Sequence, residues 1–196
     1  MSAAAHRIGP NAITRVAEAL RPRVGAAVTV KVFGRAGLLA YLAEPPAQMV
    51  DEAEVTRLHH ELRATLGHDL ARTIAREAGM RTGDYLLAHR IPKPVQTLLL
   101  WLPAPLAARV LLSAIRRHAW TFAGSGFFTA RAGRPVVLTL KDNPLCRGAV
   151  LTEPACDYYA ATFERLFCVL VHPRARALEV ACEAMGAEAC VFEIRW

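Results

Sequence analysis

The sequence predicts an α+β fold, in which helices pack with an antiparallel sheet in a single domain. Three observations support this prediction: apolar residues recur at helical spacing over most of the first 120 residues, strand-like alternation begins after residue 120, and one helical segment separates two pairs of predicted strands. The 196 residues are 54% hydrophobic and 21% charged, which is enough for the core of one ordinary globular domain.

The first 50 residues are expected to add a helix and an extended segment to the same domain. Residues 11–21 place apolar side chains at helical spacing, Asn11 can cap this helix, and Pro22 is expected to end it. Residues 24–34 are rich in valine and alternate loosely, which predicts a strand or an extended edge. The ligand-binding part of the domain is expected over residues 51–196.

Helices are predicted next, as far as residue 120. Gly79 is expected to end the second of them, because glycine is common just after helix C-termini. Their predicted ranges are 51–66, 68–78, 83–91, 94–101 and 105–120.

Four strands and one more helix complete the predicted fold. Gly124 and Gly126 in the first strand predict a bulge, or the close approach of a ligand or another backbone. The last two strands are expected to form a hairpin about Gly186. The predicted strands are 121–130, 135–140, 177–184 and 189–196, and the predicted helix is 156–170.

The charge is strongly positive, at +7 with an isoelectric point near 9.6. The basic residues are mostly arginine and are spread along the chain, which indicates a solvated basic surface; an anionic ligand, an acidic partner or an anionic membrane face are the alternatives. No aromatic-basic motif for nucleic acid occurs, so no nucleic-acid partner is expected. The longest uncharged run, 95–108, is too short to span a bilayer, and no signal peptide is found, so a cytoplasmic location with reduced or metal-bound cysteines is expected.

Four residues near the C-terminus carry side chains that bind metals, namely Cys156, Glu179, Cys182 and Cys190. In the predicted hairpin the sulfurs of Cys182 and Cys190 would face each other. Four such ligands suit zinc, and four protein ligands make a closed, structural site. Glu179 and Cys182 are three positions apart and would point to opposite faces of a regular strand, so this site requires a bulge. The alternative is that the cysteines are small buried hydrophobic residues.

A second group of candidates lies in the aromatic and basic region on both sides of residue 100. Its two histidines are each expected at a helix end, where an imidazole can bind the metal of a macrocycle or simply cap backbone carbonyls. Its aromatic residues can wall a flat ligand or belong to the core, and its arginine can pair with a ligand carboxylate. The candidate ligand-binding residues are His118, Trp120, His89, Arg90, Trp101 and Phe122.

Motifs for catalysis are not found. The sequence contains no P-loop, no Ser-His-Asp arrangement and no HExxH. GSGFFT, from Gly124, precedes a predicted strand and follows a helix, whereas a dinucleotide-binding loop needs the opposite order. No catalytic residue is predicted, and the residues alone indicate a ligand-binding or interaction domain with a structural metal.

The stretch EVACEAMGAEACVFEI resembles the C-terminal signature of the 4-vinyl-reductase domain family, with its glutamate, two cysteines and intervening glycine. KDNPL and the cysteine-led aromatic helix CDYYAATFERL resemble the segment just before that signature. RTGDYLLAHRIPKP and AIRRHAWTFAGSGFF resemble the branch of the family associated with bacteriochlorophyll biosynthesis. With these blocks the resemblance extends over most of the chain.

The resemblance implies a fold related to subunits of vesicle-tethering complexes, a homodimer, and a pocket for small hydrophobic molecules between the helices and the sheet. Members that sense aromatic compounds carry zinc on cysteines and a glutamate, and the matching positions here are Cys156, Glu179, Cys182 and Cys190. The branch is named for reduction of the 4-vinyl group of a divinyl chlorophyllide precursor.

Three functions are compatible with this resemblance. Because no nicotinamide or flavin motif is found, the favoured interpretation is a protein that binds a magnesium tetrapyrrole of the divinyl protochlorophyllide type and assists bacteriochlorophyll-biosynthesis enzymes as a carrier or accessory factor. The alternatives are a C8-vinyl reductase whose reductant comes from a partner, and a structural, dimeric assembly factor. In each case the protein is expected in the cytoplasm, with peripheral contact to the photosynthetic membrane.

Overall fold

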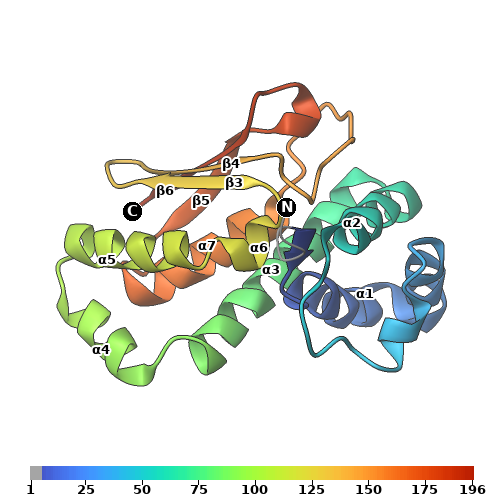
Figure 1. Ribbon diagram of the computed structural model, residues 1–196, viewed down its shortest axis with the longest axis horizontal. Helices are drawn as coiled ribbons and strands as arrows, with labels where there is room; N and C mark the ends of the chain where they lie inside the picture. The colour runs from blue at the N-terminus through green and yellow to red at the C-terminus, as the bar shows by residue number, and fades with distance from the viewer. Residues whose placement is uncertain (1–5) are drawn as a thin grey trace.

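A four-stranded antiparallel sheet forms one layer of the molecule, and helices cover one of its faces (Figure 1). The computed structural model describes residues 6–196. The strands lie in the order β3-β4-β6-β5, which places the C-terminal strand in the middle of the sheet. Their bounds are β3 Phe127–Arg131, β4 Val136–Lys141, β5 Arg176–Ala181 and β6 Cys190–Arg195. The predicted α+β class is confirmed.

The core lies between this sheet and the helices α5 and α7, and it continues among the helices of the N-terminal half. Every second residue of β4 and β6 is buried, as alternation requires for a sheet with one covered face. The helical elements are α1 Asn11–Arg35, η2 Leu39–Leu42, α2 Glu52–Leu66, α3 His68–His89, α4 Lys93–Trp101, α5 Ala104–Arg117, α6 Trp120–Ala123, α7 Asp157–Leu170 and η3 Glu183–Met185.

The N-terminal segment is joined to the remainder by a small ladder and by helix packing. β1 Arg7–Ile8 pairs antiparallel with β2 Val50–Asp51, and α1 packs on α2 and α3. The ladder connects residues on the two sides of the predicted division at residue 50, and that division stays a prediction.

The predicted strand over residues 24–34 is wrong, because this stretch is the second half of α1. Thr29, Val32 and Phe33 are buried at helical spacing, so tertiary burial outweighs the strand preference of the valines. Pro22 does not end the helix either. The break comes at Gly25, whose φ of 79° and ψ of 172° are not helical.

The predicted helix end at Gly79 is also wrong, since the segments 68–78 and 83–91 belong to the single helix α3. Gly79 and Gly83 face α7 at very close range. A Cβ atom on Gly79 would lie 2.2 Å from the carbonyl oxygen of Tyr158, and one on Gly83 would lie 2.6 Å from Cβ of Arg165. These glycines therefore allow two helices to pack closely, and they do not mark a helix end.

The region of Gly124 and Gly126 confirms the predicted close approach, and protein atoms make it. Residues 120–123 form the short helix α6, so the strand begins later than predicted, at Phe127. Gly124 has a φ of 59°, and a Cβ atom there would lie 2.0 Å from Oε2 of Glu52. A Cβ atom on Gly126 would lie 2.7 Å from the carbonyl oxygen of Lys141 in β4.

Glu52 is a buried carboxylate that ties α2 to the loop before β3. It accepts hydrogen bonds from the backbone nitrogen of Ser125 at 2.7 Å, from Oγ of Ser125 at 2.6 Å and from Nη1 of Arg147 at 2.7 Å. Burial alone would raise the pKa of Glu52, but the hydrogen bonds from Ser125 and Arg147 outweigh it and lower the pKa from 4.5 to about 2.

The free energy of unfolding is therefore expected to depend on Glu52 below pH 5. Because the pKa is lower in the folded state, the carboxylate stabilises the fold above about pH 4.5, and this contribution falls as the pH drops toward 2. The full loss is on the order of 3 kcal/mol. Urea unfolding of wild type and Glu52→Gln between pH 7 and pH 3.5 measures it: wild type should lose its advantage toward acid. Glu18→Gln, at an exposed pair with Arg15, is the control, and a wild-type advantage that does not change with pH would contradict the assignment.

Candidate metal centre

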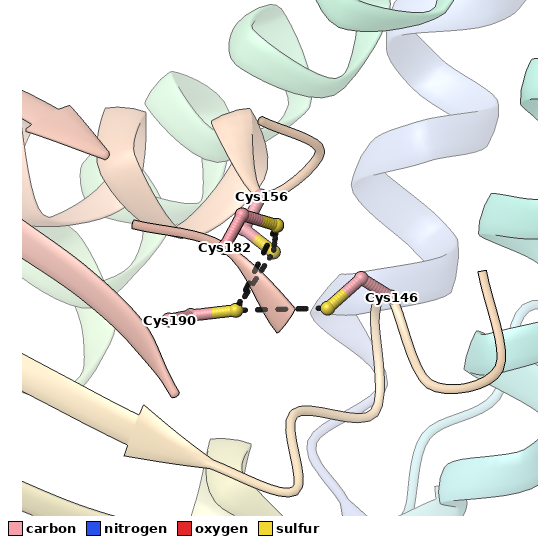
Figure 2. A group of neighbouring side chains, drawn as sticks. All are labelled: Cys146, Cys156, Cys182 and Cys190. Atoms are coloured by element: carbon pink, nitrogen blue, oxygen red, sulfur yellow. Dashed lines mark hydrogen bonds between the residues drawn. The ribbon is translucent and has the colours of Figure 1, made fainter. Parts of the chain in front are cut away.

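Four cysteines from separate segments meet at one end of the sheet (Figure 2). Cys146 lies in the loop after β4, and Cys156 immediately precedes α7. Cys182 follows β5, and Cys190 is the first residue of β6. The four sulfur atoms lie within 4.8 Å of one another, and all four residues are at most 1% exposed.

The spacing of the sulfurs fits one tetrahedral metal ion. The sulfur of Cys190 lies 3.6 Å from that of Cys146, 3.7 Å from Cys156 and 3.9 Å from Cys182, and the sulfurs of Cys156 and Cys182 are 4.0 Å apart. Four thiolates bound to zinc at about 2.3 Å define a tetrahedron with edges of about 3.8 Å. The group could therefore hold a metal ion with all four positions filled by sulfur.

Polar groups around the sulfurs suit thiolates as acceptors. Nδ2 of the fully buried Asn143 donates to the sulfur of Cys156 at 3.1 Å, and the backbone nitrogen of Glu183 donates to that of Cys190 at 3.5 Å. The carboxylate of Glu183 in turn accepts from the backbone nitrogen of Asn143 at 2.8 Å. These contacts hold the loop that carries Cys146 against the hairpin that carries Cys190.

A cation also approaches from the helical half of the molecule. Nη2 of Arg63, on α2, donates to the carbonyl oxygen of Leu145 at 3.1 Å. Burial lowers the pKa of Arg63, while the neighbouring Cys156 and Cys146 oppose this by favouring a positive charge. Burial raises the pKa of the Cys156 thiol well above its ordinary value. Metal binding at this site would thus have to displace protons, which makes it pH-dependent.

Glu179, the fourth predicted ligand, lies beside this group of sulfurs. The bulge that the sequence required is present, because the register between β5 and β6 shifts between Glu179 and Ala181. Oε2 of Glu179 accepts a hydrogen bond from the backbone nitrogen of Cys156 at 2.8 Å. Burial raises the pKa of Glu179 to about 8, with a further contribution from Cys182. Its role as a ligand stays a prediction.

The sequence analysis missed Cys146. It assigned the fourth position to Glu179 because that residue belongs to the same predicted hairpin. Strand pairing explains why Cys146 is present: Leu140 of β4 pairs with Cys190, so a cysteine just beyond β4 returns to the start of β6. The remaining cysteine, Cys168, lies on α7 and donates to the carbonyl oxygen of Ala175 at 3.0 Å, away from the four sulfurs.

The six predicted ligand-binding residues lie along α3, α4, α5 and α6 and keep the status of predictions. His89 and Arg90 are at the C-terminal end of α3, next to Tyr85. Trp101 ends α4, and it is 85% exposed. The other three residues, His118, Trp120 and Phe122, follow α5 or lie on α6. A surface hollow of about 540 Å³ lies elsewhere, between Tyr41, Met49 and the β1–β2 ladder.

Phe122 and His118 differ in their surroundings. Phe122 packs in an aromatic layer between α7 and the sheet, with ring centroids 5.1 Å from Phe128 and 5.9 Å from both Tyr159 and Phe163. His118 is exposed at the end of α5, where its Nδ1 lies 2.9 Å from the carbonyl oxygen of Ala114. The capping role considered for this imidazole is therefore present.

Comparison with known proteins defines the class. A family model for the 4-vinyl-reductase domain matches residues 136–196, which include all four cysteines. The fold is that of H-NOX proteins: the structure of an Fe(II) unliganded H-NOX protein from K. algicida matches with a TM-score of 0.62, 12% identity and 96% of each chain covered. A structure described as probing heme distortion in the H-NOX family matches with a TM-score of 0.58 and 14% identity, covering 96% of this chain and 95% of that one.

Two relatives identify the family. The bacteriochlorophyll synthase 23 kDa chain of Cereibacter sphaeroides is 45% identical over 98% of this chain and 92% of its own length. The protein of the same name from Rhodobacter capsulatus is 38% identical over 95% of this chain and 85% of its own length. This chain belongs to that family, a 4-vinyl-reductase-domain family of bacteriochlorophyll biosynthesis, which confirms the resemblance found in the sequence. Within residues 6–196, no helix has the length and apolar character needed to cross a membrane.

Proposed function

We propose that this protein acts in bacteriochlorophyll biosynthesis by binding a magnesium tetrapyrrole of the divinyl protochlorophyllide type and presenting it to the enzymes of the pathway. The observation that carries the proposal is the 45% identity, over nearly the whole chain, to a protein named as a chain of bacteriochlorophyll synthase. Proteins with this fold include H-NOX domains whose heme distortion has been studied, so the architecture is compatible with a porphyrin-like ligand.

The chemistry of His118 supports a role as the magnesium ligand. A carbonyl oxygen only accepts hydrogen bonds, so the Nδ1 that lies 2.9 Å from Ala114 must carry the proton. The lone pair of the neutral ring is then on Nε2, the arrangement that metal-binding histidines adopt when the other ring nitrogen donates to a carbonyl. Trp120 and Phe122 follow within four residues and would cover the macrocycle. Arg90 would pair with its propionate.

The cysteine group has a different role in this proposal. Zinc held by Cys146, Cys156, Cys182 and Cys190 has no open position for substrate, so it stabilises the fold and leaves chemistry to other residues. Its distance from α5 along the chain separates the structural centre from the ligand-binding residues. In this role the zinc fixes the ends of β4, β5 and β6 and the start of α7.

A spectral titration tests tetrapyrrole binding. Purified protein is titrated with magnesium divinyl protochlorophyllide without reductant, and we expect a saturating absorption shift at one pigment per chain. His118→Ala should remove the part of the shift that reports axial ligation, because it removes the Nε2 lone pair. His60→Ala is the matched control, since His60 is an exposed histidine on α2.

The alternatives predict other outcomes. Conversion of the pigment to its monovinyl form with NADPH and no second protein would contradict the carrier and favour a reductase. Conversion only after a pathway enzyme is added would favour a reductase with a partner-supplied reductant. An unchanged spectrum in every mixture, together with a stable homodimer in solution, would favour the structural assembly factor.

A further inference from the structure

The positive charge of this protein comes from one continuous segment. Residues 85–141 contain eight of the 24 lysines and arginines and none of the 17 acidic residues, so the remaining chain has 16 basic and 17 acidic residues. All eight basic side chains are exposed, and none forms an ion pair within residues 6–196. Nine arginines outside this segment do form such pairs. The basic residues are spread along the chain, as the sequence indicated, but the acidic residues are not.

The same segment exposes a group of large apolar side chains. Of the nine residues in α4, Gln96 and Leu99 are buried, and Leu98, Leu100 and Trp101 are 57%, 62% and 85% exposed. The apolar side chains of α4 therefore point mainly away from the protein, at an outer corner of the molecule beside α5 (Figure 1). On α5, the neighbouring exposed apolar residues are Leu106 and Val110. A contiguous apolar group of this kind on a protein surface usually marks an interaction site.

We propose that α4 and the exposed face of α5 dock this protein on a membrane that contains anionic lipids. In this arrangement Leu98, Leu100 and Trp101 enter the boundary between headgroups and acyl chains. Lys93, Arg109, Arg116 and Arg117 meet the lipid phosphates. The contact is peripheral, because α4 is only about 14 Å long and lies along the surface. This inference does not rest on tetrapyrrole binding.

Two features favour a membrane over a protein partner. The exposed apolar residues of α4 occur at positions 95, 98, 100 and 101, which point in several directions around the helix, whereas a protein groove requires one stripe. A fluid interface accommodates such a distribution. Trp101 and the 57% exposed Trp120 also belong to the residue type that is most typical of bilayer interfaces. The unpaired basic residues complement an anionic headgroup layer.

Vesicle binding by the full chain tests this inference. The protein is sedimented with vesicles of phosphatidylcholine alone and with vesicles that also contain phosphatidylglycerol. We expect binding to the anionic vesicles, at least ten-fold weaker binding to the neutral ones, and a decrease with added salt. Tryptophan fluorescence should shift to shorter wavelength on binding, because Trp101 leaves water.

Two variants separate the contributions. Leu98→Ser with Leu100→Ser should abolish the fluorescence shift and weaken binding at least ten-fold, and Arg109→Gln with Arg116→Gln should weaken binding about five-fold for each charge removed. Leu178→Ser with Val180→Ser on β5, and Arg174→Gln, are matched exposed controls that should bind as wild type. Equal binding to both vesicle types would overturn the proposal, as would unchanged binding by the α4 variant. A wild-type dimer that avoids vesicles and dissociates in the α4 variant would assign this surface to a second copy of the chain.

Discussion

Replacing Cys146 with serine is expected to remove the bound metal and to destabilise the C-terminal half of the protein. Wild type should contain one zinc per chain by elemental analysis, and Cys146→Ser should contain close to none, because a serine hydroxyl replaces a thiolate in a four-sulfur site. Structural zinc contributes on the order of 10 kcal/mol in small zinc domains, so a loss of several kcal/mol is expected here. Urea unfolding of both proteins measures it.

Two further variants make this experiment specific. Cys168→Ser is the matched control, since Cys168 lies outside the group of four and should leave the zinc content unchanged. Glu179→Gln distinguishes the two candidates for the fourth position: full zinc content assigns that position to Cys146, and loss of zinc makes Glu179 a ligand as well. Equal metal content in wild type and Cys146→Ser would contradict the four-cysteine site. Iron in place of zinc would keep the site and change its metal.

The second large effect is expected from a single methyl group between α3 and α7. In Gly79→Ala the new Cβ would lie 2.2 Å from the carbonyl oxygen of Tyr158 and 2.9 Å from Cβ of Ala161. Both obstacles are part of the packed helix α7 or its backbone, so the helices must separate. Overpacking of this kind costs roughly 1–3 kcal/mol, and the contact with backbone places this case at the upper end.

Gly34→Ala is the matched control for this prediction. Gly34 is an exposed helical glycine in α1, and a Cβ atom there meets nothing within 4 Å. The same substitution should therefore stabilise the protein, by up to about 1 kcal/mol, because alanine favours the helix over glycine. Thermal or urea unfolding compares the two variants. Equal effects of the two substitutions, or a stabilised Gly79→Ala, would show that α3 and α7 are less closely packed than described.

The fold class could be predicted from the sequence because its strand pairs are locally encoded. Val136, Leu138 and Leu140 alternate in β4, and Phe192 and Ile194 do so in β6. The errors occurred where a distant segment decides the local structure. Valines at residues 24–34 form a helix because Val32 and Phe33 are buried in the helical core, and no pattern within the stretch reveals this.

The same reasoning explains what could be predicted of the metal centre. Cys182 and Cys190 belong to one hairpin, so local symmetry about Gly186 brought them together. Cys156 was recovered by residue type and by the family resemblance. Cys146 depends on the pairing of β4 with β6, which joins residues 50 positions apart, such as Leu140 and Cys190. Side-chain spacing within one element does not contain that information.

The four cysteines come from four segments whose outermost members are 44 residues apart in the chain. The full coordination sphere can therefore form only after β4 has found β6 and α7 has reached its place, which are late, non-local events in folding. Metal uptake would then report that the C-terminal half is complete. A cell that is short of zinc should accumulate chains whose N-terminal helices have formed and whose sheet has not, and such chains are natural substrates for proteolysis.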